Sequence, residues 1–501
     1  MGISVRIPIR SICLLTVLLL SLWWCWEAGF AVAQSDTVTW FGSVNLSNTP
    51  QYSGHPAIVA DGYGYVHVFW SENVGDVPME SQVGTPQGNS ILYTRWDGVS
   101  WTPPVDIAFV PGETIAEFVA VDMDAENRLH IVWTGQSNFY YSDALSWQAE
   151  SAHAWSTPVV LASDSARSSW ESDIAADPSG TLHVVYATRR DAPGIYHICS
   201  LDGGRTWQPA VRLSDPFGPL EYSFSNVKLV ADEVGRLHVV WQTTQAEGFG
   251  QAIYYARSTD GGESWSAPVQ LGYRDPGDYE ASWPYLTAIG ASEPHLIYID
   301  GQSSIGRFHR ISKDGGETWS VPHHILTDME GVNGYLVPLV DSAGQLHLMI
   351  NMRTRAGQVV GIYYARWQGD GWSPVVPVDL SDLASHYLAA TVRLGNELHV
   401  VWNGIRGGEI WHKRGIVSSA TPVSVPVVPS SPTSTPSPPA DAQVTPQMPT
   451  LIPQSVEEPL DLPGRAMASS TNSNPLVLGG GSAFLLVIVV VVRTRLRLLR
   501  N

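Results

Sequence analysis

Hydrophobic and polar residues form a short strand-like segment that recurs seven times along the chain. In each copy a histidine stands among aliphatic and aromatic residues, as in VHVFW (66–70) and LHVVW (237–241). Runs of this kind, bounded by Gly, Asp and Pro, are typical of β-strands. The seven histidines are His67, His130, His183, His238, His295, His347 and His399. Their successive gaps of 63, 53, 55, 57, 52 and 52 residues indicate one structural unit repeated along the chain.

Each unit is predicted to hold four strands. A strand ending in an Asp/Gly turn, such as ADGYG (60–64), precedes the histidine strand, and a Tyr-rich strand such as IYYARS (253–258) follows it. A tight turn then leads to a fourth strand, as in SWSAPVQL (264–271). Four short antiparallel strands in about 50 residues form a propeller blade. The sequence therefore predicts an all-β fold, a seven-bladed β-propeller of four-stranded antiparallel blades, over residues 37–417.

The two ends of this region are predicted to pair. The seventh unit stops after its third strand, near Val417, whereas the region begins with a segment, VTWFGSVNLS (38–47), that resembles a fourth strand. Its Trp40 precedes Val44 at the same spacing as Trp265 precedes Val269. We expect the N-terminal strand to complete the last blade, because this closes the ring and removes open sheet edges.

The repeated histidines are interpreted as structural. A residue that recurs at the same position in every blade is expected to stabilise the blade. Equivalent positions in different blades of a propeller lie too far apart to bind one metal ion. We therefore expect seven buried, hydrogen-bonded histidines instead of a ring of metal ligands. We predict no metal site and no cofactor.

Both ends of the chain are predicted to be targeting or anchoring segments. Residues 1–33 are typical of a secretory signal peptide, with Arg6 and Arg10 before an apolar run and Ala31-Val32-Ala33 after it. An uncleaved N-terminal anchor is the alternative interpretation. Near the other end, the apolar residues 476–492 are predicted to form a single transmembrane helix.

The charge that follows this helix predicts its orientation. The tail, residues 493–501, carries Arg493, Arg495, Arg497 and Arg500, which marks it as cytoplasmic. Residues 418–475 are dense in Pro, Ser and Thr and are predicted to be a disordered stalk. The sequence thus predicts a single-pass protein of the cell membrane with its propeller outside the cell.

Cysteine content and net charge limit which interactions can stabilise the fold and which partners can bind. Removal of the signal peptide leaves Cys199 as the one cysteine, so no disulfide within the mature chain is expected. The formal net charge is −19, which excludes nucleic acid as a partner because like charges repel.

The turns between third and fourth strands carry a sharper motif. Residues 200–207 (SLDGGRTW), 258–265 (STDGGESW) and 312–319 (SKDGGETW) share Ser-x-Asp-Gly-Gly-x-Ser/Thr-Trp. This motif resembles the Asp-box, or BNR repeat, of the sialidase superfamily, and the resemblance covers roughly residues 37–417. In such a turn Asp accepts backbone N–H bonds, Gly takes positive φ, and Trp is expected to pack against its own blade. We interpret these residues as structural: Asp202, Trp207, Asp260, Trp265, Asp314 and Trp319.

Function is expected on the opposite face. In a four-strand meander the tight turns share one face, and the longer 2–3 and 4–1 connections share the other, where binding residues concentrate. Acids, arginines and aromatic rings in these connections suit sugar binding, since rings stack on C–H faces and charged groups bond to hydroxyls or carboxylates. The candidate ligand-binding residues are Trp170, Glu171, Asp173, Tyr222, Tyr279, Glu280, Trp283, Arg189, Arg190, Arg353 and Arg406. Ordinary solvated loops, with aromatic rings plugging the channel mouth, are the alternative.

The resemblance to sialidases implies a set of catalytic residues and a sequence motif that this chain does not show in full. That family uses three arginines around the substrate carboxylate, a Tyr–Glu nucleophile pair, an Asp acid/base and a Phe/Tyr-Arg-Ile-Pro motif. The one Arg-Ile-Pro here, at 6–8, lies in the predicted signal peptide, and sialidases have six blades, so no catalytic residue is carried over. If the protein is an enzyme, the first candidates are Tyr279, Glu280, Glu221, Tyr222, Arg190 and Arg353.

Three functions remain open at this point. The first is a membrane-anchored extracellular module that recognises a glycan or a cell-surface protein through its loop-rich face. The second is a sialidase-like glycoside hydrolase or lyase acting on extracellular glycans. The third is a structural component of a surface layer.

Overall fold

The computed structural model describes most of the region that carries the repeats. The described residues are 38–49, 51–73, 88–108, 115–163, 172–188, 192–214, 223–244, 250–273, 280–301, 305–331, 335–355, 359–381, 385–404, 408–426 and 428. The predicted signal peptide (1–33), transmembrane helix (476–492) and basic tail (493–501), and the stalk beyond residue 428, lie outside these residues. Within the described part of the chain, no helix has the length and apolar character needed to cross a membrane.

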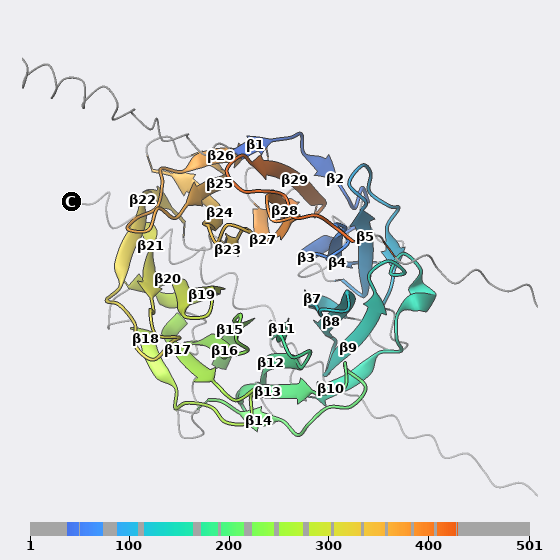
Figure 1. The fold of residues 1–501 in the computed structure, drawn as a ribbon, viewed down its shortest axis with the longest axis horizontal. Helices are drawn as coiled ribbons and strands as arrows, with labels where there is room; N and C mark the ends of the chain where they lie inside the picture. The colour runs from blue at the N-terminus through green and yellow to red at the C-terminus, as the bar shows by residue number, and fades with distance from the viewer. Residues whose placement is uncertain are drawn as a thin grey trace, which may run out of the picture. The chain divides into compact units, whose positions relative to one another are not determined.

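The described strands form six hydrogen-bonded antiparallel sheets arranged around a common axis (Figure 1). Four of these sheets have four strands each. Their strands are β3 (Ser53–Ala60), β4 (Val66–Glu72), β5 (Ser90–Trp96) and β6 (Val105–Asp106); β7 (Glu117–Met123), β8 (Arg128–Thr134), β9 (Asn138–Leu145) and β10 (Val159–Ser163); β11 (Ser172–Ala176), β12 (Leu182–Thr188), β13 (Gly194–Ser200) and β14 (Val211–Arg212); β15 (Ser223–Ala231), β16 (Leu237–Thr244), β17 (Gly250–Ser258) and β18 (Val269–Tyr273).

The other two sheets are larger. An eight-stranded sheet holds β19 (Glu280–Ile289), β20 (Glu293–Gly301), β21 (Ile305–Ile311), β22 (His323–Glu330), β23 (Leu336–Val340), β24 (Leu346–Thr354), β25 (Val360–Arg366) and β26 (Val376–Asp379). A five-stranded sheet holds β27 (Ser385–Arg393), β28 (Glu397–Gly404) and β29 (Ile410–Val417) with β1 (Val38–Trp40) and β2 (Val44–Asn45). A short 3₁₀ turn, η2 (Ala152–Ala154), lies between β9 and β10.

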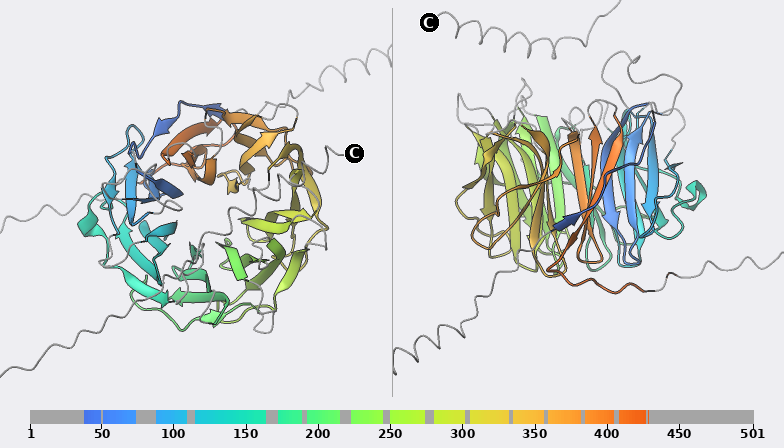
Figure 2. Two further views of the ribbon diagram at one scale, coloured as in Figure 1. Left: turned by 180° about the vertical axis from the view of Figure 1, so that it is seen from behind. Right: turned by 90° about the horizontal axis from the view of Figure 1, so that it is seen from above.

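The sheets stand radially, and their first strands lie nearest to the common axis (Figures 1 and 2). These inner strands contact one another in a closed cycle, β3–β7–β11–β15–β19–β23–β27 and back to β3. Side chains between neighbouring sheets make the hydrophobic core, for example Trp133 and Trp241, which are almost fully buried. The protein is therefore an all-β propeller.

The prediction of seven separate four-stranded blades is wrong, because the strands form six hydrogen-bonded sheets, of which one has eight strands and one has five. The eight-stranded sheet consists of two four-strand meanders, β19–β22 and β23–β26. They are continuous because the end of β22 runs on to pair Met329 with Thr354 and Glu330 with Arg353 of β24. The fifth strand of the closing sheet arises because its N-terminal edge is broken into β1 and β2 between Trp40 and Val44.

Pairing of the first strands with the last is confirmed. Strand β1 pairs with β29 through Val38↔Val417, Thr39↔Ile416 and Trp40↔Gly415. Strand β2 pairs with the same strand through Val44↔His412 and Asn45↔Trp411. The outer edge of the last sheet is thus supplied by the N-terminal part of the chain, and the ring is latched where the two ends of the repeat region meet.

The seven repeated histidines are all fully buried and hydrogen-bonded, as predicted. In each, Nδ1 lies 2.7–3.1 Å from a tyrosine hydroxyl oxygen or a histidine Nε2 on the third strand. The partners are Tyr93, Tyr141, His197, Tyr255, His309, Tyr364 and His412. Each Nε2 lies 3.1–3.6 Å from a carboxylate in or beside the first turn: Asp61, Asp124, Asp177, Asp232, Glu293, Asp341 or Glu397. These chains of polar groups cross each meander from its first turn to its third strand.

The Asp turn and the buried histidine support each other. Asp61 Oδ1 accepts the backbone N–H groups of Tyr63 and Tyr65 at 3.0 and 2.7 Å, which leaves Oδ2 facing His67. Burial lowers the pKa of His67, and it lowers the pKa of His197 to about 3. Both imidazoles are therefore neutral at physiological pH, and each can donate from one ring nitrogen while it accepts at the other.

The Asp-Gly-Gly turns are built as expected, with one correction. Asp202 Oδ1 accepts the N–H of Thr206 at 2.8 Å, and Gly203 and Gly204 take φ values of 70° and 89°. The tryptophan, however, also makes a ring contact with the preceding meander and is not confined to its own. The pairs are Trp40–Tyr364, Trp101–His412, Trp155–Tyr93, Trp207–Tyr141, Trp265–His197, Trp319–Tyr255 and Trp372–His309, with ring centroids 4.8–6.1 Å apart. These tryptophans join neighbouring meanders around the ring.

The chain stays packed on the propeller after β29. Ala420 is buried, Thr421 O accepts from Ser342 Oγ at 3.1 Å, and the N–H of Val423 donates to Leu394 O at 2.8 Å. Ser342 and Leu394 belong to turns between first and second strands. The described chain therefore leaves β29 along the face that carries the tight turns.

Candidate functional site

A cavity of about 280 Å³ lies in the central channel. Its lining comes from the first half and the middle of the inner strands, and its outermost residues lie toward the N-terminal ends, where the chain enters each meander. Those ends lie on the face of the 2–3 and 4–1 connections, opposite the Asp-Gly-Gly turns. We call this region the mouth, and define it by His55, Phe118, Ser172, Asp173, Asn226, Lys228, Trp283, Tyr335 and Tyr387.

The backbone is locally distorted to aim side chains into the mouth. The inner strands β3, β7, β15 and β19 each contain a register shift near their first residues. Within these bulges His55, Phe118, Asn226 and Trp283 take φ values of 50°, 55°, 50° and 55°. Positive φ is costly for bulky residues and is kept where the surroundings enforce it, often at functional sites. The bulge therefore serves to re-aim these side chains.

Hydrogen bonds from the neighbouring strands hold some of these bulges in place. The N–H of Trp283 donates to Gln242 Oε1 at 2.7 Å, and the N–H of Tyr387 donates to Asn403 Oδ1 at 2.8 Å. Both acceptors are buried side chains near the ends of second strands. The aromatic residues of the mouth are thus fixed through their backbone and not by packing alone.

Five rings form a continuous arc around one side of the mouth. Neighbouring centroids are 3.9 Å apart for Phe118–His55, 4.1 Å for His55–Tyr387, 5.2 Å for Tyr387–Tyr335 and 5.0 Å for Tyr335–Trp283. His55 and Phe118 are buried, whereas Trp283, Tyr335 and Tyr387 are partly exposed. We call these five residues the aromatic collar. The three exposed rings offer apolar surface to a ligand in the channel.

Polar side chains line the opposite side of the mouth. Ser172, Asp173, Asn226 and Lys228 line the cavity from β11 and β15. The Ser172 hydroxyl is buried and has no hydrogen-bond partner among the described residues. Asp173 Oδ2 accepts the N–H of Leu229 at 3.0 Å, and burial raises the pKa of this carboxyl. The mouth therefore combines an apolar arc with a polar arc that holds an acid, an ammonium group and a hydroxyl.

A second buried carboxyl lies close to this arc and gives a testable pH dependence. Asp122 Oδ2 accepts the N–H of Ala176 at 2.8 Å, and burial raises the pKa of Asp122 to about 6. Between about pH 4 and pH 6 the unfolded chain loses this proton while the folded chain keeps it, so stability falls as pH rises. Asp122→Asn removes this contribution. The free energy of unfolding of Asp122→Asn relative to the unchanged protein should rise by about 2–3 kcal/mol from pH 4 to pH 7.5.

Urea unfolding at several pH values measures this difference. The control is Glu126→Gln, which removes a negative charge from an exposed side chain in the turn between β7 and β8. A pH-independent difference for Asp122→Asn would contradict the assignment of a raised pKa to this carboxyl.

The structure brings only some of the predicted site residues together. Asp173 and Trp283 both line the mouth. Arg353 does not line it; its Nε lies 2.8 Å from Glu330 Oε1 where β22 meets β24, and about half of the side chain is exposed. Glu280 begins β19. The remaining candidates lie outside the described residues: Trp170, Glu171, Arg189, Arg190, Glu221, Tyr222, Tyr279 and Arg406.

Most residues of the collar are not among the candidates predicted from the sequence, although the sequence carries a signal for them. His55, Phe118, Asn226, Trp283, Tyr335 and Tyr387 each stand twelve positions before a repeated histidine, from 55 and 67 to 387 and 399. The register of first and second strands makes these positions equivalent. The same count from His183 gives Glu171. Aligning the repeats on the histidines would therefore have identified the ring of mouth residues.

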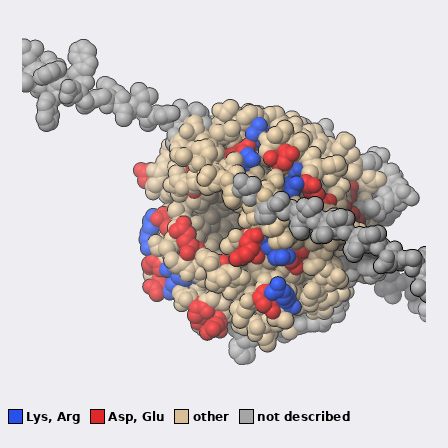
Figure 3. Space-filling view, turned by 45° about the vertical axis from the view of Figure 1, so that its right-hand side comes forward, with Lys and Arg blue, Asp and Glu red and all other residues tan. Residues whose placement is uncertain are grey.

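On the face seen in Figure 3, acidic and basic side chains are interspersed over the sheets. This mixture, like the overall negative charge, does not favour a polyanion. Among the described residues that line the cavity, Asp173 and Lys228 are the charged ones.

Comparisons with known proteins identify structures of similar fold but no sequence family to which the chain can be assigned. No protein-family model and no characterised protein sequence matches the chain. Among solved structures, the BP39L lectin from Burkholderia pseudomallei is similar with a TM-score of 0.52 and 15% identity, over 75% of this chain and 100% of the lectin. A protein of unknown function from Dyadobacter fermentans is similar with a TM-score of 0.51 and 14% identity, over 76% of this chain and 99% of that one.

A sialidase is also among the similar structures. The Hadza microbial sialidase Hz136 has a TM-score of 0.42 and 15% identity, over 74% of this chain and 66% of the sialidase. This value is too low to support an argument about activity. Together, the lectin and the Dyadobacter protein support one statement, which is that this chain has a β-propeller fold.

Proposed function

We propose that this protein is an extracellular propeller that recognises a glycan at the mouth of its channel. The observation that carries the proposal is the aromatic collar facing a polar arc across one cavity. A sugar ring has apolar C–H faces and polar hydroxyl edges, so it needs both kinds of surface at once. Trp283, Tyr335 and Tyr387 supply the first, and Ser172, Asp173 and Lys228 supply the second.

The chemistry of each arc supports a saccharide over a purely apolar ligand. An apolar ligand would leave the buried Ser172 hydroxyl without a partner, at a cost of about 1–3 kcal/mol. Asp173 and Lys228 can accept from and donate to ring hydroxyls. Similarity to a lectin of known structure is consistent with this proposal, although at 15% identity it extends to the fold alone.

The predicted membrane anchor fits the position of the mouth. The described chain leaves β29 on the face of the tight turns, whereas the mouth opens on the other face. If residues 476–492 span the membrane, as the sequence predicts, the stalk begins at the face opposite the mouth. The site then remains accessible to ligands outside the cell.

A glycan array probed with the full chain in detergent tests this proposal. We expect binding to a limited set of saccharides, and competition by the corresponding free sugar. Retention of no glycan, together with capture of a cell-surface protein that glycosidase treatment does not affect, would replace the glycan with a protein ligand.

Glycoside hydrolysis is the second candidate function, and Asp173 is the observation that favours it. A carboxyl whose pKa is raised by burial, placed in a cavity, is the form that a general acid takes. A hydrolase would need a second carboxylate or a Tyr–Glu pair across the mouth, for which Glu171, Glu221, Tyr222, Tyr279 and Glu280 remain the candidates. Release of fluorophore from aryl glycosides, abolished by Asp173→Asn, would establish this function instead.

A further inference from the structure

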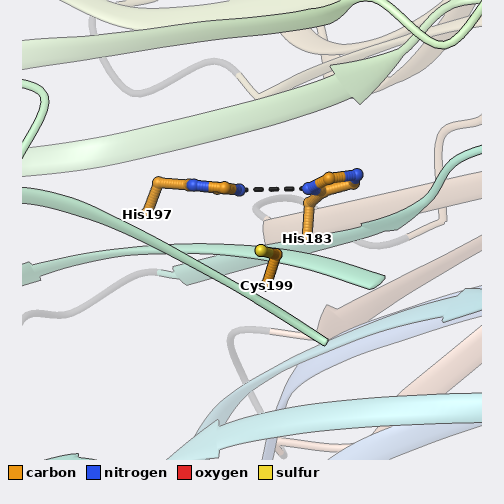
Figure 4. A group of neighbouring side chains, drawn as sticks. All are labelled: His183, His197 and Cys199. Carbon is orange, nitrogen blue, oxygen red and sulfur yellow. Dashed lines mark hydrogen bonds between the residues drawn. The ribbon is translucent and has the colours of Figure 1, made fainter. Parts of the chain in front are cut away.

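Outside the mouth, one cluster of side chains combines three groups that bind metals. His183 lies on β12, and His197 and Cys199 lie on the adjacent strand β13. The register pairs His183 with Cys199, and all three side chains project from the same side of the sheet. Their ligand atoms all lie within 4.8 Å of one another, and Figure 4 shows the sulfur of Cys199 beside the two facing imidazoles.

The spacing of the two imidazoles is close to that of a metal site. His183 Nδ1 and His197 Nε2 are 3.1 Å apart. Two nitrogens bound to one tetrahedral zinc ion at about 2.0–2.1 Å lie about 3.3 Å apart, and zinc–sulfur bonds are about 2.3 Å long. An ion placed between the rings on the side of Cys199 therefore needs little change in the separation of the two nitrogens, together with a rotation of the rings and an approach of Sγ from within 4.8 Å.

The surroundings of His183 resemble the outer shell of a metal site. Its Nε2 lies 3.4 Å from Asp177 Oδ2, while Asp177 Oδ1 accepts the N–H of Thr181 at 2.9 Å. A carboxylate on the far nitrogen fixes the proton there, so that Nδ1 presents its lone pair. The ligating atom of His183 is thus oriented before any ion arrives.

Comparison with the other paired histidines separates this cluster from a purely structural one. His295–His309 and His399–His412 form the same contact at 2.9 Å. Opposite the second-strand histidine, however, these pairs have Ile311 and Arg414 where the first has Cys199. Among the described residues, only the His183–His197 pair includes a thiol.

The third-strand histidines also differ in whether the ring proton can move from one nitrogen to the other. Trp372 Nε1 donates to His309 Nδ1 at 3.3 Å, which fixes the single N–H proton of that ring on Nε2. The corresponding Trp265 packs 5.0 Å from His197, but its buried indole N–H has no hydrogen-bond partner among the described residues. His197 can therefore move its proton from Nε2 to Nδ1 and offer Nε2 to an ion.

We propose that His183 Nδ1, His197 Nε2 and Cys199 Sγ bind one Zn²⁺ ion, with the fourth position open to water. Thiolate and imidazole ligands together select a borderline-soft cation over Mg²⁺ or Ca²⁺. On binding, the thiol proton passes to solvent, the N–H proton of His197 moves to Nδ1, and no redox change occurs. This site lies near the Asp-Gly-Gly turn of its meander and is separate from the mouth, so it goes beyond the proposed function. It departs from the expectation that the chain has no metal site.

Equilibrium dialysis of the full chain against Zn²⁺, and titration with Co²⁺ as a spectroscopic substitute, test the proposal. We expect one more tightly bound Zn²⁺ per chain in the unchanged protein than in Cys199→Ser. The Co²⁺ complex should show a near-ultraviolet thiolate-to-metal absorption that Cys199→Ser lacks. Cys199 is partly exposed and close in size to Ser, so the variant is expected to fold, and its circular dichroism spectrum checks this.

The pair without a thiol provides the matched control. His309→Gln changes an equivalent buried histidine, so it should leave the number of bound Zn²⁺ ions and the Co²⁺ absorption unchanged. Equal Zn²⁺ binding by the unchanged protein and Cys199→Ser, or a Co²⁺ spectrum without the sulfur band, would overturn the site.

Discussion

Replacing Trp283 with alanine is expected to weaken glycan binding at least tenfold, the largest single effect at the mouth. Trp283 ends the aromatic collar, is partly exposed, and is held by its bulge and by the bond from its N–H to Gln242. Loss of the apolar contact of a stacking ring removes about 1.5–3 kcal/mol, and each 1.4 kcal/mol is a factor of ten. Isothermal titration with the best saccharide from the array measures the change.

Two further variants separate loss of contact from loss of fold. Trp283→Phe keeps a ring and should recover most of the affinity. Trp147→Ala removes a partly buried tryptophan that contacts Tyr63 at a tight turn on the opposite face, so it should leave affinity unchanged. If Trp283→Ala binds the saccharide as tightly as the unchanged protein, the collar is a plug of the channel and the ligand binds elsewhere.

The strands and their order could be predicted because the sequence repeats them. Each unit carries its own histidine strand, Asp turn and Tyr-rich strand, and local hydrophobic pattern determines such elements. The latch between β1 and β29 was predictable for the same reason, since Trp40 and Val44 repeat the spacing of a fourth strand. Burial of the histidines followed from their fixed place in every unit.

Contacts between units could not be predicted in the same way. The continuity of the eight-stranded sheet depends on two residue pairs at the end of β22, and no repeat marks them. The packing of Trp207 on Tyr141 depends on how one meander faces the next. A repeated motif reveals its own hairpin, but it does not reveal which neighbour its side chain reaches.

The sequence predicted the face of the propeller on which the site lies, but only some of the residues that form it. Trp283 was found because it falls in a segment that the sequence predicts to be a connection and that is conspicuously rich in charged and aromatic residues. His55 and Phe118 were missed because they lie within strands, where bulges with positive φ turn them toward the mouth. Backbone distortion of that kind leaves no local sequence pattern, so only the alignment of repeats could have indicated it.

Replacing Trp40 with alanine is expected to lower the free energy of unfolding by about 3 kcal/mol. Trp40 lies on the N-terminal edge strand, pairs with Gly415, and packs on Tyr364 of the neighbouring meander with centroids 6.1 Å apart. It therefore connects three parts of the ring: the first strand, the last strand and the adjacent meander. Since Trp40 is partly buried, the lower end of the range for Trp→Ala applies. Chemical unfolding and hydrogen exchange of β29 measure the loss.

The neighbouring Phe41 supplies the control for the latch. Phe41 is 38% exposed and stacks on the Arg414 guanidinium at 4.0 Å, an interaction of about 0.5–1 kcal/mol at an exposed site. Phe41→Ala should therefore cost less than about 1 kcal/mol and leave exchange in β29 slow. In Trp40→Ala, amides of β29 that face β1 should exchange faster than those that face β28, because the outer edge opens first. Similar losses for the two variants would mean that the first strand covers the sheet without holding the ring closed.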